Sequence, residues 1–473
     1  MQNDISSNIK KVFFVFLLCF IAIISYITYF EFYKSEEVAK SPYNRRLWAI
    51  RNEVLRGTIY DRNMTALTKS ERVNTETQKR TYTAGEVFAH ALGYVDIKYG
   101  LTGLERKYDT ELMGAESVNL VQLIKNKGKE EEKIGHNLKT TLDINVQKTA
   151  YDMLGNNRGA VVALNPKTGE VLAMVSKPSY DPNNLNEIWD NLQNDKANHP
   201  LINRATGGLY PPGSTFKAVT AISALENIKG ITTRKFEDKG KLVFNQKESL
   251  SNYNGEVLGN IDFKEAFYHS SNVFFGNLGL ELGNDKLRAT AEKFFFNKNT
   301  PTDGITIENS KFPTYKNYEK GNIAQSAIGQ AEVLATPMEM ALVAATVANN
   351  GVMMKPYLVQ QVMDSKGKAI KTIQPEKNGE FISKDNAKIM QDLMRAVVTN
   401  GTGGAAEVSG ITAAGKTGTA DHVESKNPHA WFIGFAPYDN PQIAVAVIVE
   451  EGGVGGKAAA KIAGQVMKTA IKK

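Results

Sequence analysis

Three short motifs of serine, lysine, asparagine and threonine follow one another along the chain and could form one catalytic centre. They occupy Ser214–Lys217, Ser270–Asn272 and Lys416–Thr419. A serine hydroxyl is a weak nucleophile until a neighbouring base takes its proton, and a deprotonated lysine can be that base. The set therefore predicts covalent catalysis, with an acyl group carried on Ser214.

Each motif is weak by itself, because similar short patterns recur elsewhere in this chain. Ser-x-x-Lys also occurs at 7–10 and 365–368, and Lys-Thr-Gly also occurs at 167–169. The first copy precedes a long apolar run, and the other two lie in polar turns with no helical pattern behind them. Context therefore favours Ser214 over the other serines.

Ser214 stands at the start of a predicted helix. Pro211-Pro212-Gly213 predicts a turn, and a helical apolar pattern continues to Leu225. Free backbone N–H groups at a helix N-terminus favour developing negative charge. Lys217, three residues on, shares the face of Ser214, and burial beside another cation would lower its pKa. The alternative is that Ser214 is only a helix cap.

The second motif lies between predicted helices at 263–269 and 273–282, so we expect a short exposed connection. There Ser270 can relay a proton to a leaving amine, and Asn272 can bind an amide of the substrate. Taken alone, serine and asparagine at this point would indicate a turn or a cap.

The third motif is rich in small residues and predicts an edge strand that an extended peptide could join. Lys416 would supply positive charge, and Thr417 and Thr419 would offer hydroxyls to a substrate carboxylate, with Gly418 between them. The backbone N–H groups of Ser214 and Thr419 would form the oxyanion hole.

Other chemistries lack support in the sequence. The six histidines show no metal-ligand spacing, and we expect His422 and His429 to be solvated on a loop. Cys19 is the single cysteine, so an internal disulfide and a cysteine metal site are excluded. No phosphate-binding or dinucleotide fingerprint occurs. We therefore predict no metal and no cofactor.

The elements around the motifs predict one α/β domain. Apolar β-prone runs at 159–164 and 171–175 flank an Asn-Pro-Lys-Thr-Gly turn, which indicates a hairpin. Segments 431–435 and 443–449 are predicted strands, and 143–154, 214–225, 337–349 and 457–471 are predicted helices. We expect the first and last strands to pair in a central antiparallel sheet that helices flank.

Four regions are predicted along the 473 residues. An uncharged run at 12–30 is long enough to span a membrane, and Lys10 and Lys11 before it favour a cytoplasmic N-terminus. A cleaved signal peptide is disfavoured because no small-x-small site follows promptly. The net charge of +7 is mild and gives no support for nucleic-acid binding. The predicted regions are a tail (1–11), an anchor (12–30), a small mixed pedestal domain (31–145) and a catalytic domain (146–473).

Taken together, these motifs resemble the class B penicillin-binding proteins, which are monofunctional peptidoglycan D,D-transpeptidases. The likeness covers essentially everything after residue 50, and the compact pedestal resembles the short elongation- or division-type members. The matching segments are Arg56–Asn63 and Gly103–Gly114 in the pedestal, then Tyr210–Lys217, Gly329-Gln330 with Thr336-Pro337, Gly401–Gly403 and His429–Gly434.

The resemblance implies a transpeptidase domain similar to the serine β-lactamases and a reaction in two steps. Ser214 would attack a stem peptide ending in D-Ala-D-Ala, release the terminal D-alanine, and pass the acyl group to a neighbouring amine. β-Lactams would acylate Ser214, and a membrane glycan polymerase of the elongation, division or sporulation type would be the partner. Alternatives are a D,D-carboxypeptidase or β-lactamase, which uses water, and a β-lactam sensor or a non-catalytic division scaffold.

Overall fold

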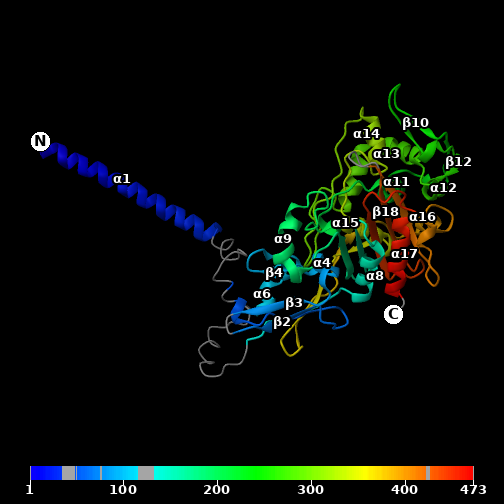
Figure 1. Cartoon of the computed structure of the whole chain (residues 1–473). Coiled ribbons are helices and arrows are strands. Elements are labelled where there is room, and N and C mark those ends of the chain that lie inside the picture. Colours follow the sequence, from blue (N-terminus) through cyan, green and yellow to red (C-terminus); the bar gives the residue numbers. More distant parts are fainter. Residues whose placement is uncertain are drawn as a thin grey trace.

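The structure is a computed structural model that describes residues 2–34, 48, 51–74, 77–114, 133–421 and 427–471. Outside the N-terminal helix, the described chain has a pedestal, a central sheet between helices, and a helical lobe (Figure 1). The pedestal and the lobe lie at opposite ends of the sheet. The predicted fold class, a central antiparallel sheet flanked by helices with a small mixed pedestal, is confirmed.

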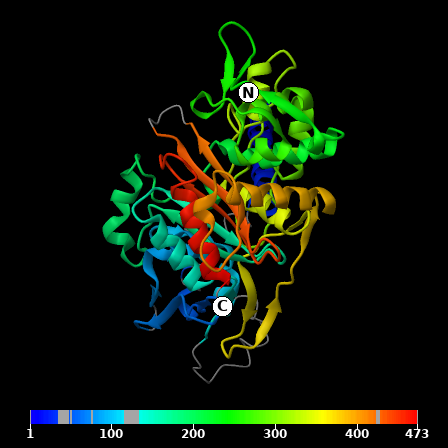
Figure 2. The ribbon, with the colours of Figure 1, turned by 90° about the vertical axis from the view of Figure 1, so that its right-hand side faces the viewer.

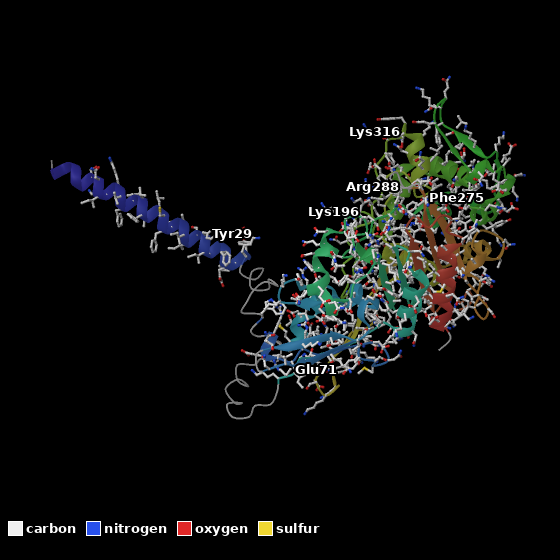
Figure 3. The ribbon with its side chains drawn as sticks, in the orientation of Figure 1. Tyr29, Glu71, Lys196, Phe275, Arg288 and Lys316 are labelled. Carbon is white, nitrogen blue, oxygen red and sulfur yellow. The ribbon has the colours of Figure 1, made fainter. Side chains whose placement is uncertain are left out.

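The N-terminal helix α1 (Gln2–Tyr29) runs into one π-helical turn, η1 (Phe30–Lys34). The 28 residues from Ser7 to Lys34 are long and apolar enough to cross a membrane, and none of them is buried. Figure 3 shows the side chains of α1, Tyr29 among them, projecting clear of the other elements. Cys19 is one of these exposed side chains.

The pedestal is built from short strands and helices around a few buried aromatic and aliphatic side chains. The hairpin of β2 and β3 is its longest regular element, with Thr68 opposite Tyr82. The lysine-rich segment at 125–133 lies almost wholly outside the described residues. The pedestal elements are β1 (Ile59–Tyr60), β2 (Thr68–Arg72), β3 (Gln78–Tyr82), η2 (Gly85–Val87), α4 (Ala89–Leu92), β4 (Val95–Asp96), β5 (Gly100–Leu101), α5 (Gly103–Lys107), α6 (Asp109–Leu112) and β6 (Asn137–Thr140).

A buried ion-pair network joins the two pedestal motifs. Arg56 Nε donates to Glu105 Oε2 at 2.6 Å, and Arg56 Nη1 donates to Asp109 Oδ1 at 2.7 Å. Arg80 Nε donates to the second Glu105 oxygen at 2.8 Å. Burial opposes the charge of Glu105, but Arg80 and Arg56 hold the pKa of this carboxyl below its usual value. Glu105 is therefore the anion on which two buried cations depend.

A five-stranded antiparallel sheet forms the centre of the catalytic domain, in the order β17-β18-β19-β7-β8. The first strand, β7, pairs with the last, β19, as predicted, and Ala446 lies opposite Val162. The predicted hairpin is also confirmed. The strands are β7 (Gly159–Leu164), β8 (Val171–Lys177), β17 (Ala414–Ala420), β18 (His429–Ala436) and β19 (Ile443–Val449).

Helices cover both faces of this sheet, which explains why β7 and β19 are apolar throughout. Val445 and Val447 of β19 point toward α8 (Ile144–Leu154) and α17 (Ala458–Ile471), while the residues between them face α15 (Pro337–Ala348). Figure 2 shows α17 crossing in front of the sheet. Because both faces are buried, no alternation of polar and apolar residues is seen in these strands.

A second sheet joins the pedestal to the catalytic domain. Its order is β1-β6-β14-β15, and β14 (Val359–Met363) pairs antiparallel with β6 of the pedestal. β15 (Ala369–Thr372) extends the same sheet. Strands from both sides of the predicted 145/146 boundary therefore share one hydrogen-bonded sheet, and sequence spacing gave no sign of this pairing.

The helical lobe packs around α13, which runs to Lys293 and so exceeds the predicted helix by more than two turns. Gly283, with a φ of +74°, interrupts its helical backbone. The remaining elements are η4 (Pro182–Asn184), α9 (Leu185–Asn194), α10 (Arg204–Gly207), η5 (Gly213–Phe216), α11 (Lys217–Asn227), η6 (Ile231–Thr233), β9 (Lys235–Asp238), β10 (Lys241–Val243), β11 (Ser249–Ser251), η7 (Tyr253–Gly255), β12 (Gly259–Asp262), α12 (Phe263–Tyr268), α13 (Asn272–Lys293), α14 (Lys320–Ser326), β13 (Val352–Met354), β16 (Lys377–Glu380), α16 (Lys384–Thr399) and η8 (Gly404–Ala406).

Replacing Glu105 by alanine should destabilise the pedestal by about 3–5 kcal/mol, because it leaves the buried Arg80 side chain without its anion and Arg56 with Asp109 alone. The measurement is the free energy of unfolding of the full chain in urea. Glu71→Ala is the matched control, since Glu71 lies exposed on the outer hairpin of the pedestal (Figure 3). Equal effects of the two substitutions would contradict the role given to Glu105.

Candidate active site

Ser214 lies in a 3-10 turn rather than in the first turn of an α-helix. The turn η5 begins at Gly213, and α11 begins only at Lys217, so the predicted helical start is three residues too early. Gly213 has a φ of +52°, and a Cβ at this position would come within 2.7 Å of the Thr419 carbonyl oxygen. The glycine therefore allows the serine turn to lie against β17.

Side chains from the sheet hold the turn that precedes Ser214. Tyr210 donates its hydroxyl to Glu450 Oε1 at 2.7 Å, and Arg204 Nε donates to the same oxygen at 2.7 Å. Trp431 Nε1 donates to the Pro211 carbonyl at 3.0 Å. The segment before the serine is thus fixed to β18 and to the end of β19.

Lys217 is fully buried on α11, and its amine meets the second motif. Nζ donates to the Ser270 carbonyl and to Asn272 Oδ1, both at 2.7 Å, and lies 3.2 Å from Ser270 Oγ. Burial and the positive charge of Lys416 lower its pKa well below the ordinary value, while the Asp238 carboxylate opposes this effect. A lysine that acts as a base requires a pKa lowered in this way.

Lys416 on β17 is equally buried and approaches the same hydroxyl. Its Nζ donates to Ser270 Oγ at 2.9 Å and to the Thr417 carbonyl at 3.0 Å. Burial lowers its pKa to about 7. Lys416 does not line the cleft, so its charge would act on a substrate from beneath Ser270 and Thr417. Ser270 Oγ is thus the point where the three motifs meet.

Ser270 itself adopts an uncommon backbone conformation, with a φ of +60°. A non-glycine residue in this region costs free energy and persists where its surroundings hold it. Here both lysine amines contact the Ser270 hydroxyl, and the Lys217 amine also donates a hydrogen bond to the Ser270 carbonyl. This conformation places the Ser270 hydroxyl within hydrogen-bonding distance of the Lys217 and Lys416 amines.

An open cleft of about 530 Å³ lies beside this cluster. β17 is the edge strand of the sheet, and Thr417 and Thr419 on it line the cleft. Gly418 does not line it; a Cβ there would come within 2.9 Å of Thr215 in the serine turn. The predicted site residues that line the cleft are Ser214, Ser270, Asn272, Thr417 and Thr419.

The second motif is less exposed than predicted. Ser271 is buried as the N-cap of α13, where its hydroxyl accepts from Phe274 N at 2.9 Å. Asn272 has both ends of its amide engaged, because Nδ2 also donates to the Ser251 carbonyl at 2.9 Å. The prediction of a short exposed connection is therefore wrong for Ser271, because its hydroxyl is held against the buried Asp238 carboxylate.

The prediction for His429 is also wrong. His429 begins β18, is buried, and accepts at Nδ1 from the Glu451 backbone N–H at 3.1 Å. His422 lies outside the described residues.

Asp238 is a positioning residue that the sequence did not reveal. Its buried carboxylate accepts from Ser271 Oγ at 2.5 Å, from Asn252 Nδ2 at 2.9 and 3.0 Å, and from Gly240 N at 2.8 Å. Asn252 Oδ1 accepts in turn from Val273 N at 3.0 Å. This network holds the second motif in place through Ser271, the central residue of that motif. The residues of the network lie far apart in the sequence.

No group of histidine, cysteine and acidic residues that could hold a metal ion occurs among the described residues.

Comparison with known proteins places this site in a family. Residues 159–468 match the penicillin binding protein transpeptidase domain, and residues 56–138 match the penicillin binding protein A dimerisation domain. The peptidoglycan D,D-transpeptidase PbpA of Mycolicibacterium smegmatis is 36% identical, with 83% of this chain and 84% of that protein covered. The chain is a class B penicillin-binding protein.

Solved structures agree with this assignment. Penicillin-binding protein A from Mycobacterium tuberculosis superposes with a TM-score of 0.83 at 32% identity, covering 89% of this penicillin-binding protein and all of that chain. Its penicillin G acyl-enzyme complex gives 0.82 at 32% identity, with the same coverage. MrdA of Escherichia coli K12 is 29% identical, over 80% of this chain and 69% of that protein.

Replacing Asp238 by asparagine should move the acidic limb of penicillin acylation to lower pH. The Asp238 charge raises the pKa of Lys217, so its removal lowers that pKa, and the free amine is then present at lower pH. On that limb, each unit of displacement raises the rate about tenfold. Stopped-flow acylation by a fluorescent penicillin between pH 5 and 9 measures the displacement.

Glu237→Gln is the matched control, because Glu237 is the neighbouring carboxylate on β9 but is 71% exposed. Its acidic limb should stay in place. An unmoved limb in the Asp238 variant would show that this carboxylate has no electrostatic effect on the base.

Proposed function

We propose that this penicillin-binding protein cross-links peptidoglycan stem peptides through an acyl-Ser214 intermediate. The observation that carries the proposal is the convergence of Lys217 and Lys416 on Ser270 Oγ, at 3.2 and 2.9 Å, beside the cleft that Ser214 lines. Relatives that are named peptidoglycan D,D-transpeptidases support the choice of substrate.

In the first step, Ser214 Oγ attacks the carbonyl carbon of the penultimate D-alanine while its proton passes to neutral Lys217. The backbone N–H groups of Ser214 and Thr419 stabilise the oxyanion, each worth about 2.7–4 kcal/mol. The C–N bond then breaks, Ser270 relays a proton to the leaving nitrogen, and D-alanine departs. The acyl group is left as an ester on Ser214.

In the second step, the amine of a neighbouring stem attacks that ester. A new amide bond forms, the C–O bond to Ser214 breaks, and the amine proton returns through the same lysine and serine to Ser214 Oγ. The donor strand lies along the edge strand β17, as an added strand. Before the terminal D-alanine leaves, its carboxylate faces the hydroxyls of Thr417 and Thr419, with the charge of Lys416 beneath them, and Asn272 meets an amide of the donor.

The proposal extends to the placement of the chain. Residues 1–11 form a cytoplasmic tail, 12–30 a single-pass anchor, 31–145 the pedestal, and 146–473 the transpeptidase domain outside the cell membrane. Lys10 and Lys11 before the apolar run support this orientation. Protease added outside spheroplasts should digest the catalytic domain. If the catalytic domain were protected instead, the proposed orientation in the membrane would be wrong.

A membrane glycan polymerase is the proposed partner, since cross-linking requires freshly made glycan strands as substrate. In-cell photo-crosslinking from α1 should capture a polytopic glycosyltransferase. If only other membrane proteins were captured, a glycan polymerase would not be the partner.

The direct test supplies nascent glycan strands bearing D-Ala-D-Ala stems and measures the products by mass. We expect cross-linked dimers and one free D-alanine for each link. Ser214→Ala should form no dimers, and Ser365→Ala, which alters another Ser-x-x-Lys copy, should leave the yield unchanged. Trimmed monomers without dimers would indicate a carboxypeptidase, and dimers from Ser214→Ala would place the nucleophile elsewhere.

A further inference from the structure

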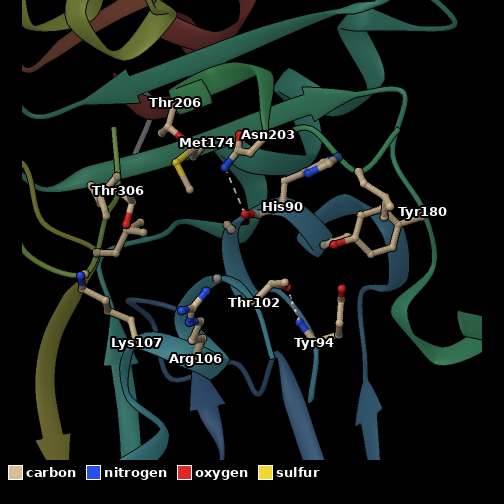
Figure 4. A pocket seen from close by; sticks show the side chains of 17 residues that line it. His90, Tyr94, Thr102, Arg106, Lys107, Met174, Tyr180, Asn203, Thr206 and Thr306 are labelled. Atoms are coloured by element: carbon tan, nitrogen blue, oxygen red, sulfur yellow. Dashed lines mark hydrogen bonds between the residues drawn. The ribbon is translucent and has the colours of Figure 1, made fainter. Parts of the chain in front are cut away.

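A second cavity, of about 720 Å³, lies where the pedestal meets the catalytic domain. Pedestal helices α4 and α5 form one side, and β8, α10 and the segment 304–306 form the other (Figure 4). We call it the junction pocket. Its volume is typical of small-molecule sites, which occur preferentially at domain interfaces.

The junction pocket has a one-sided charge. Arg106 and Lys107, at the end of α5, line it, and no aspartate or glutamate is among its lining residues. Both side chains are exposed, and within the described part of the chain neither makes an ion pair. Figure 4 shows them on the pedestal side, opposite Thr206 and Met174.

The walls supply hydrogen-bonding and apolar groups. Asn203 Nδ2 donates to the His90 carbonyl at 3.2 Å, which ties the two sides of the pocket together. Burial lowers the pKa of His90 to about 4, so the imidazole is neutral at pH 7 and the positive charge belongs to the α5 cations. Further lining side chains are Thr206, Thr306, Met174, Leu201, Ile305 and Leu358.

We propose that the junction pocket binds a small ligand that carries a carboxylate or a phosphate. Arg106 would hold the anion through paired N–H groups, with Lys107 as a second charge. The threonine hydroxyls would take polar groups of the ligand, and the apolar wall would cover its uncharged part. This site is separate from the Ser214 cleft, since the two cavities share no lining residue.

Two sources could provide such an anion, and two probes distinguish them. Inorganic phosphate represents a phosphate ligand. N-acetylmuramyl-L-alanyl-D-isoglutamine represents a carboxylate from peptidoglycan, and this arm rests on the proposed function. The full chain in non-ionic detergent is first acylated with penicillin so that the Ser214 cleft is closed, and calorimetry then measures binding of each probe.

We expect at least one probe to bind. The double variant Arg106→Gln with Lys107→Gln should weaken binding about tenfold or more, because charge-assisted hydrogen bonds are lost. The control pair, Lys69→Gln with Lys79→Gln, removes the same charge from the exposed pedestal hairpin and should change nothing. Binding of one probe alone identifies the source of the anion.

Failure to bind either probe, or an equal loss in both double variants, would overturn the proposal. Failure of penicillin to acylate would count against the proposed function instead. Phosphate binding is also measured on the unacylated chain, where the Arg106 and Lys107 double variant assigns it to the junction pocket, so the two failures remain distinguishable.

Discussion

Two buried lysines that share one serine hydroxyl set the main constraint on this structure. Lys217 and Lys416 both approach Ser270 Oγ, within 3.2 Å, and both are cut off from water. Burial disfavours the charged form of both amines, and the charge of Lys416 lowers the pKa of Lys217 further, so the site favours the neutral form of Lys217. This is the form that the proposed role of Lys217 as a base toward Ser214 requires. Asp238 lies behind the second motif and limits how far the pKa of Lys217 falls.

The surrounding fold keeps this unfavourable cluster in place. The motifs lie on different elements: the first on η5 and the start of α11, the second at the start of α13, and the third on β17. Hydrogen bonds from Tyr210 and Trp431 fix the serine turn to the sheet, and Asp238 fixes Ser271. Because the strands are buried on both faces, their apolar packing can offset the cost of burying two amines. The pedestal is tied to the same body through the pairing of β6 with β14.

Local sequence patterns predicted the helices and strands of the catalytic domain. The features that these patterns did not reveal depend on contacts between residues far apart in the sequence. The apolar run at 443–449 and the hairpin at 159–175 could be predicted as strands, because apolar runs and an Asn-Pro-Lys-Thr-Gly turn are local signals. Pro211-Pro212-Gly213 likewise marks the serine turn. Asp238 could not be found in this way, since its partners lie 14 and 33 residues away and its own segment is rich in ordinary charges. The burial of Ser271 and the strand pairing across the predicted domain boundary depend on equally distant neighbours.

If this protein is a transpeptidase, Ser214 forms an acyl-enzyme with penicillin from which water removes the acyl group slowly. Intact-mass analysis of the native chain after penicillin treatment, with peptide mapping and a time course, measures both parts together. We predict one adduct per chain, on the peptide that contains Ser214, still present after hours at pH 7. An adduct on another peptide, or its loss within seconds, would contradict the claim.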